Sequence, residues 1–104
     1  MSFELRTTPG CPNSSPALEL FHAALRAEGL DPGLVTVLEL TSEAEAAALQ
    51  FHGSPSFISD GRDLFPSAAG TGLSCRVYPT GSGLSGLPSL ESLRTGVRGP
   101  GAAA

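Results

Sequence analysis

The chain lacks several features that would assign it to a class at once. Its 104 residues contain no tryptophan, one tyrosine and only two cysteines. Six basic side chains stand against ten acidic ones and form no basic stripe, which argues against a nucleic-acid partner. No run of about 18 apolar residues occurs, so we expect no membrane partner and no segment that crosses a bilayer.

The first residues and the cysteine count bear on location. Residues 1–6 show no basic stretch followed by an apolar one, so they do not match a secretory signal. We therefore expect a cytoplasmic protein, in which thiols stay reduced. In that setting Cys11 and Cys75 are interpreted as reactive, metal-binding or buried thiols rather than as a structural disulfide.

Hydrophobic patterning predicts alternating strands and helices up to residue 59. Strands are expected at residues 2–7, 34–40 and 55–59, and helices at 16–28 and 42–50. Residues 34–40 are almost continuously apolar, which predicts a central strand covered on both faces. Ser42 and Glu45 match the capping box that opens a helix.

The second half of the chain gives a weaker pattern. The Asp-Gly pair at 60–61 predicts a hairpin turn, and residues 62–73 are expected to form a loop. A fourth strand is expected at 75–79, where a proline ends it, and a last helix at 88–95. Residues 80–87 contain a literal GxGxxG, interpreted as a flexible connection because no acidic strand follows about 20 positions on.

These elements predict an α/β domain of order βαβαββα, with a four-stranded mixed sheet flanked by helices. A long helix between the first two strands requires a parallel pair with a right-handed crossover. A short turn between the last two strands gives an antiparallel hairpin. We expect residues 2–97 to form this single domain and residues 98–104 a flexible C-terminal tail.

Two local motifs give the chain a resemblance to the thioredoxin-like superfamily. Residues 10–14 (Gly-Cys-Pro-Asn-Ser) lie where that superfamily carries Cys-x-x-Cys or Cys-x-x-Ser. Residues 53–57 (Gly-Ser-Pro-Ser-Phe) open the third strand, where it places a cis-proline beside the reactive cysteine. Residues 53–63 and 75–78 also resemble a bacterial group of small thioredoxin-like proteins. The resemblance implies the thioredoxin fold over about residues 2–96.

The expected chemistry centres on Cys11. Ser14 replaces the second cysteine of the dithiol pattern, so Cys11 is a monothiol in a Cys-Pro-Asn-Ser motif and closes no local disulfide. Near a helix N-terminus, unpaired N–H groups and the helix dipole stabilise a thiolate. Pro16 favours a different start: if the helix begins there with Ser15 as its cap, Cys11 lies a full turn upstream and is less activated.

The candidate site residues have two expected roles. The catalytic candidates are Cys11, Ser14 and Cys75. The substrate-binding candidates are Pro12, Asn13, Ser54 and Pro55. A cis Ser54–Pro55 bond would present the neighbouring backbone to a substrate disulfide or a bound thiol. We expect no cofactor and no metal at this site.

Cys75 and His52 leave alternatives open. Cys75 is a resolving thiol, a small buried apolar side chain or a metal ligand. Antiparallel pairing of its strand would put it far from Cys11, unless residues 62–73 fold back over the site. His52 either steadies a Cys11 thiolate or is a solvated residue at a helix end.

The sequence thus predicts a thiol-redox protein that uses Cys11 for thiol–disulfide exchange or mixed-disulfide formation. As a monothiol oxidoreductase it would act on a low-molecular-weight thiol or a protein disulfide. One alternative is a non-catalytic thioredoxin-fold binding or adaptor module, which Ser14 in place of a cysteine favours. Another is a thiol-dependent protein that handles a heavy metal.

Overall fold

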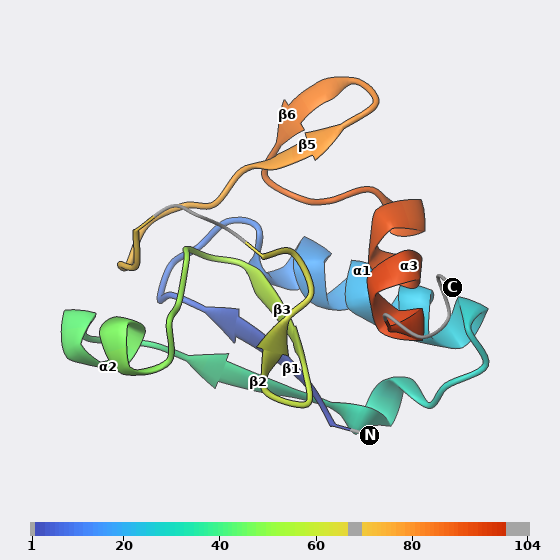
Figure 1. Ribbon diagram of the computed structural model, residues 1–104, viewed down its shortest axis with the longest axis horizontal. Coiled ribbons are helices and arrows are strands. Elements are labelled where there is room, and N and C mark those ends of the chain that lie inside the picture. The colour runs from blue at the N-terminus through green and yellow to red at the C-terminus, as the bar shows by residue number, and fades with distance from the viewer. Residues whose placement is uncertain (1, 67–69, 100–104) are drawn as a thin grey trace.

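A computed structural model describes residues 2–66 and 70–99 (Figure 1). The helices are α1 (Ser14–Ala27), α2 (Glu43–Ala48) and α3 (Leu90–Arg98), with a 3-10 turn η1 (Pro32–Leu34). The strands are β1 (Phe3–Thr7), β2 (Val35–Glu39), β3 (Ser56–Ser59), β4 (Arg62–Asp63), β5 (Tyr78–Thr80) and β6 (Gly83–Ser85). In the described part of the chain, no helix has the length and apolar character needed to cross a membrane.

Four of the strands form one mixed sheet in the order β2-β1-β3-β4. Strand β1 pairs parallel with β2 and antiparallel with β3, and β4 is antiparallel to β3. Helices α1 and α3 pack side by side, and α2 lies beyond the end of β2 (Figure 1). The predicted α/β domain with a four-stranded mixed sheet and flanking helices is therefore confirmed.

The core lies between this sheet and α1 with α3. Alternation along β1 sends Phe3 and Leu5 to one face, and Phe57 of β3 joins them in register with Leu5. Phe21 of α1 packs edge-on against Phe57, with the ring centroids 5.2 Å apart. Because β1 is central and α1 crosses it, residues 8–13 between them are held at one end of the sheet.

The prediction of a central strand at residues 34–40 is wrong. Strand β2 is an edge strand, and Val37 is 53% exposed. A continuous apolar run is compatible with burial on both faces, but it does not fix the order of strands in a sheet. Here the exposed Val37 faces a hollow beside Cys11 instead of the core.

The fourth strand of the sheet is β4, which lies inside the loop predicted at 62–73. The predicted hairpin turn precedes it, with left-handed backbone at Asp60 (φ 49°) and Gly61 (φ 81°). Left-handed geometry at both positions suits the twist of a two-residue hairpin. The turn was thus predicted correctly, but the short return strand carries too little apolar pattern to be recognised.

Residues 75–79 do not join the sheet as the predicted antiparallel strand. Cys75 instead forms an isolated parallel bridge with Ser54, and Tyr78 opens the separate β5–β6 hairpin. The predicted flexible connection at 80–87 is largely this hairpin, which projects beyond the sheet in Figure 1. The glycines of the GxGxxG serve a turn, as expected for a sequence without a following acidic strand.

Side-chain caps fix the starts of the two shorter helices. Ser42 accepts a hydrogen bond from the N–H of Glu45 at 3.1 Å, as the capping box predicts. Ser89 accepts from the N–H of Ser92 at 3.1 Å, and α3 then continues to Arg98, the first residue of the expected tail. Residues 100–104 of that tail lie outside the described residues.

Candidate functional site

Cys11 lies in the turn between β1 and α1. Its N–H donates to the carbonyl of Thr8 at 3.3 Å, and its carbonyl accepts from the N–H of Ser14 at 3.2 Å. Helix α1 begins at Ser14 with Asn13 as its N-cap, so the start at Pro16 is wrong. Proline is tolerated in the first turn because N–H groups there have no partner within the helix. Cys11 is therefore two residues before the cap rather than a full turn upstream.

The hydrogen bonds around the Cys11 sulfur favour its thiolate. Burial raises the pKa of this thiol, but four hydrogen bonds outweigh burial and lower the pKa below its ordinary value. The hydroxyl of Ser54 makes the largest favourable contribution, followed by the N–H of Asn13 and then the hydroxyl and N–H of Ser14. The side chain of Cys11 is half-buried, so the sulfur is both stabilised and reachable.

Ser54 ties the Cys11 turn to the start of β3. The Ser54–Pro55 peptide bond is cis, and Ser54 is fully buried. Besides bonding to the Cys11 sulfur, its hydroxyl accepts a hydrogen bond from the N–H of Thr8 at 3.2 Å. The hydroxyl thus holds the Cys11 turn through Thr8 and contributes to the lowered pKa of the thiol.

The backbone of Ser54 is already paired within the chain. Its N–H donates to the carbonyl of Ser74 at 2.8 Å, and its carbonyl accepts from the N–H of Arg76 at 3.0 Å. The sequence predicts that backbone beside Pro55 faces a substrate, and at Ser54 that backbone is paired with residues 74–76. Residues 74–76 fill the place along the strand that an external chain would need.

Cys75 is exposed and lies directly opposite Ser54 in the parallel bridge. Two expectations fail here: Cys75 is not a buried apolar thiol, and it is not far from the start of β3. The cause is the path of residues 74–76, which run parallel beside Ser54 instead of pairing antiparallel with β3.

Two buried side chains, those of Arg76 and Tyr78, hold residues 74–78 in place, and neither was predicted to have a role. The guanidinium of Arg76 donates to Asp63 at 2.7 Å, to the Ser56 hydroxyl at 3.0 Å and to the Phe65 carbonyl. The Tyr78 hydroxyl donates to the carbonyl of Pro55. A buried arginine and a buried tyrosine need such partners, but their identity depends on contacts far apart in the sequence.

The packing of residues 74–76 against the chain before Ser54 requires glycine at position 53. Gly53 has φ +115°, and a Cβ there would lie 3.0 Å from Cβ of Arg76 and 3.1 Å from the Ser74 carbonyl oxygen. The segment thus packs directly on the backbone before Ser54. Glycine at position 53 was the one signal in the sequence that could have indicated this contact, because glycine often marks a site where another backbone approaches closely.

A hollow of about 300 Å³ opens at the Cys11 sulfur, between α1 and β2. Leu18 and Val37 form apolar walls, and Glu39 is the charged side chain of its lining. Of the two other predicted substrate-binding residues, Pro12 is exposed, and Asn13 packs its side chain against Gly86 after β6. The residues that line this hollow do not include Ser54 or Cys75.

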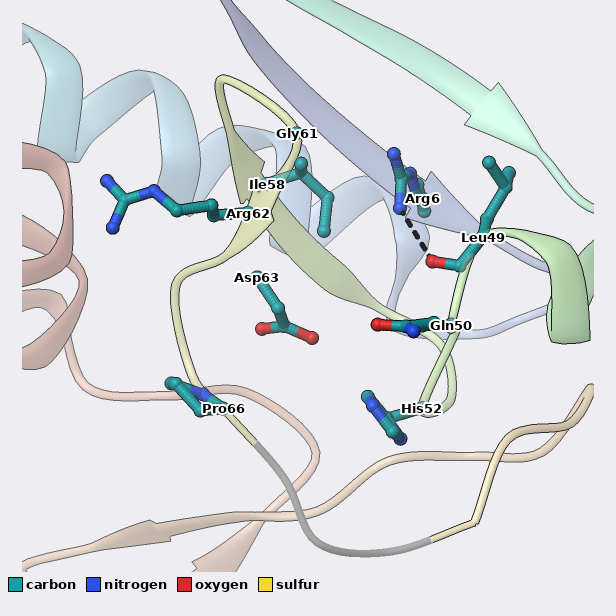
Figure 2. Close-up of a pocket in the computed structure, with 9 residues that line it drawn as sticks. All are labelled: Arg6, Leu49, Gln50, His52, Ile58, Gly61, Arg62, Asp63 and Pro66. Atoms are coloured by element: carbon teal, nitrogen blue, oxygen red, sulfur yellow. Dashed lines mark hydrogen bonds between the residues drawn. The ribbon is translucent and has the colours of Figure 1, made fainter.

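His52 does not line the hollow at Cys11. It lies in the wall of two others, one of about 430 Å³ with Arg6, Gln50 and Asp63, and one of about 630 Å³ with Cys75. Figure 2 shows the side chains of Gln50, His52 and Asp63 around the first of these. The Nδ1 atom of His52 is buried and has no hydrogen-bond partner among the residues that the structure describes. A direct role for His52 at the Cys11 thiolate gains no support.

The comparisons with known proteins do not add to this geometry. No family model, curated protein or solved structure matches the chain. Within residues 2–66 and 70–99, no group of three or more His, Cys, Asp and Glu side chains is arranged to hold a metal ion. A function is therefore inferred from the Cys11 thiol and the groups around it.

Proposed function

We propose that the protein is a thioredoxin-fold thiol-redox protein that uses Cys11 for thiol–disulfide exchange. The fold part of the proposal is supported by the strand order β2-β1-β3-β4, with a cysteine turn after β1 and a cis-proline before β3. The observation that carries the activity is the set of hydrogen bonds that lowers the pKa of the half-buried Cys11 thiol.

The reaction starts from the Cys11 thiolate. It attacks one sulfur of a disulfide, forms a mixed disulfide and releases the other half as a thiolate. The donors from Ser54, Asn13 and Ser14 hold the attacking sulfur in its charged form until the new bond forms. Ser14 has no sulfur with which to resolve the mixed disulfide, so a thiol from elsewhere must do so.

Alkylation of single-thiol variants tests this proposal. Cys75→Ser leaves Cys11 as the sole thiol, and Cys11→Ser leaves the exposed Cys75 as an internal reference. Rates with iodoacetamide, measured across pH, should inflect for Cys11 below the ordinary thiol pKa of about 8.5. Cys75→Ser should also form a mixed disulfide with bis(2-hydroxyethyl) disulfide. An ordinary inflection at Cys11, together with no mixed disulfide, would refute the proposal.

A non-catalytic binding or adaptor module is the second candidate. Ser14 in place of the second motif cysteine favours it, because the local motif then lacks the dithiol of a reductase. Such a module needs no reactive thiol. An unreactive Cys11 in the same alkylation series would therefore favour the second candidate over the first.

A further inference from the structure

We propose that residues 74–76 are a built-in substrate strand that presents Cys75 to Cys11 as the resolving thiol. This inference rests on the proposed exchange activity of Cys11. Cys75 would supply the second thiol, which the local motif lacks because Ser14 stands in place of a cysteine. It also explains why the backbone of Ser54 is paired with the chain itself.

Both cysteines converge on the side chain of Ser54. Directly paired residues of neighbouring strands project from the same face, so the Cys75 side chain leaves the bridge on the side of the Ser54 hydroxyl. That hydroxyl is the one that bonds to the Cys11 sulfur. Neighbouring strands lie about 4.8 Å apart. Ser54 thus adjoins both segments, Cys75 through the strand bridge and the Cys11 turn through the hydrogen bond from the N–H of Thr8.

The strand that carries Cys75 is fixed while its thiol is free. Alternation sends Arg76 and Tyr78 inward, where Arg76 is 7% and Tyr78 2% exposed. It sends Cys75 and Val77 outward, and Val77 is 60% exposed. The Arg76 guanidinium also lies 4.8 Å from the centre of the Tyr78 ring. The buried anchors therefore hold the backbone at Cys75 and leave its sulfur accessible.

In this proposal the Cys11 turn is the segment that moves to close a disulfide. Its own backbone is held by hydrogen bonds of 3.2 and 3.3 Å, at the long end of the usual range. A disulfide requires Cα atoms within about 7 Å of each other. Movement of this exposed turn toward a fixed partner is less costly than movement of a strand anchored by buried Arg76.

The proposed exchange balances as two successive displacements. The Cys11 thiolate attacks a disulfide RSSR, forming Cys11–S–S–R and releasing one RS⁻. The Cys75 thiolate then attacks the Cys11 sulfur, forming the Cys11–Cys75 disulfide and releasing the second RS⁻. The protein dithiol is oxidised, the substrate disulfide is reduced, and two protons leave the protein thiols. A second dithiol or two low-molecular-weight thiols return the protein to its reduced form.

The substrate must then approach Cys11 from the hollow between α1 and β2. The opposite approach, along Ser54, is closed by residues 74–76. The incoming disulfide therefore occupies the side of Leu18 and Val37, while Cys75 attacks from the side of Ser54. Two separate approaches to one sulfur let the leaving thiol depart without displacing the resolving strand.

Intact mass after reaction with bis(2-hydroxyethyl) disulfide tests the inference. Reduced wild-type protein should pass through a mercaptoethanol adduct at Cys11 and end two hydrogens lighter than the reduced chain, as a monomeric Cys11–Cys75 disulfide. Cys75→Ser should stop at the adduct. Cys75→Ser/Ser82→Cys keeps two thiols but moves one to the exposed β5–β6 turn, and it should also stop at the adduct.

The outcomes separate this inference from the proposed function. If wild type stops at the adduct like Cys75→Ser, Cys11 is reactive and the built-in strand is refuted. If the Ser82→Cys double variant closes a disulfide as fast as wild type, the bridge to Ser54 gives no advantage and the inference is again refuted. If Cys11 stays unmodified in Cys75→Ser, the proposed function fails, and the inference fails with it.

Discussion

Two segments meet at Ser54, and they are held there in different ways. The Cys11 turn is short and local, and its bonds are to the backbone of residues next to it or to Ser54. The Cys75 strand is held by a buried ion pair and a buried tyrosine from distant parts of the chain. The first segment has a sulfur with a lowered pKa on a lightly held backbone, and the second has an exposed sulfur on a firmly held backbone.

This difference suggests a division of labour between the two thiols. Reactivity requires donors aimed at the sulfur, and the start of a helix supplies them within a few residues. Resolution requires only that a second sulfur stay in place, which buried contacts achieve without altering its chemistry. Substitutions in each segment should therefore separate stability from reactivity.

The largest expected effect is on the strand side. Arg76→Ala leaves Asp63 without its partner in a part-buried site, and the loss of one member of a buried ion pair costs about 3–5 kcal/mol. Because small domains have only about 5–15 kcal/mol of stability, this variant should unfold at a much lower urea concentration. Arg98→Ala is the matched control. It removes an exposed pair with Glu28 and should cost under about 1 kcal/mol. Equal losses in the two variants would contradict the anchoring role of Arg76.

The next effect concerns the contact between the strand and Gly53. Gly53→Ala adds a Cβ at a left-handed φ and against Ser74 and Arg76, which should cost about 1–3 kcal/mol. It should also slow formation of the Cys11–Cys75 disulfide, because the added Cβ displaces residues 74–76 from their position beside Ser54. Gly81→Ala introduces a Cβ into open space and serves as the control. Disulfide formation at the wild-type rate in Gly53→Ala would show that the close packing of residues 74–76 against Gly53 is not needed for disulfide formation.

The same division explains what the sequence could predict. The Cys11 turn, the cap at Ser42 and the turn at residues 60–61 follow from residues a few positions apart, so local rules locate them. The edge position of β2 and the bridge of Cys75 follow from which strands meet in space. No local pattern encodes the pairing of Arg76 with Asp63, so the fold-back and the partner of Ser54 could not be predicted.

A smaller effect is expected on the turn side. Ser54→Ala removes the strongest favourable hydrogen bond to the Cys11 sulfur, so the pKa of Cys11 should rise. Alkylation of Cys11 at pH 7 in the Cys75→Ser background should then slow several-fold, because less thiolate is present. Ser15→Ala is the control, since Ser15 lines the same hollow but is not among the groups that shift the thiol. An unchanged rate in Ser54→Ala would refute the role of its hydroxyl.

The lowered pKa of Cys11 also links stability to pH. The native thiol loses its proton at lower pH than the unfolded one, whose pKa is the ordinary value of about 8.5. Wild type should therefore gain stability over Cys11→Ser as pH rises through the lowered native pKa, and the gain should be complete above that ordinary value. It should be lost again as pH falls through the native pKa. A constant difference in urea midpoints across this window would contradict the shift.

The smallest expected effect concerns which disulfides enter the hollow. Glu39 is exposed and is the one charge in the lining beside Cys11, Leu18 and Val37, so it should favour cationic over anionic substrates. Two unit charges about 7 Å apart in water interact by about 0.6 kcal/mol, which corresponds to about threefold in rate. Glu39→Gln should slow the reaction of Cys11 with the diamine cystamine by about that factor and leave bis(2-hydroxyethyl) disulfide unaffected. The cystamine difference should shrink as salt is added, because exposed charges are screened. Equal slowing with both disulfides would mean that Glu39 affects the shape of the hollow and not its electrostatic potential. Substrates would then be selected by their size and shape rather than by their charge.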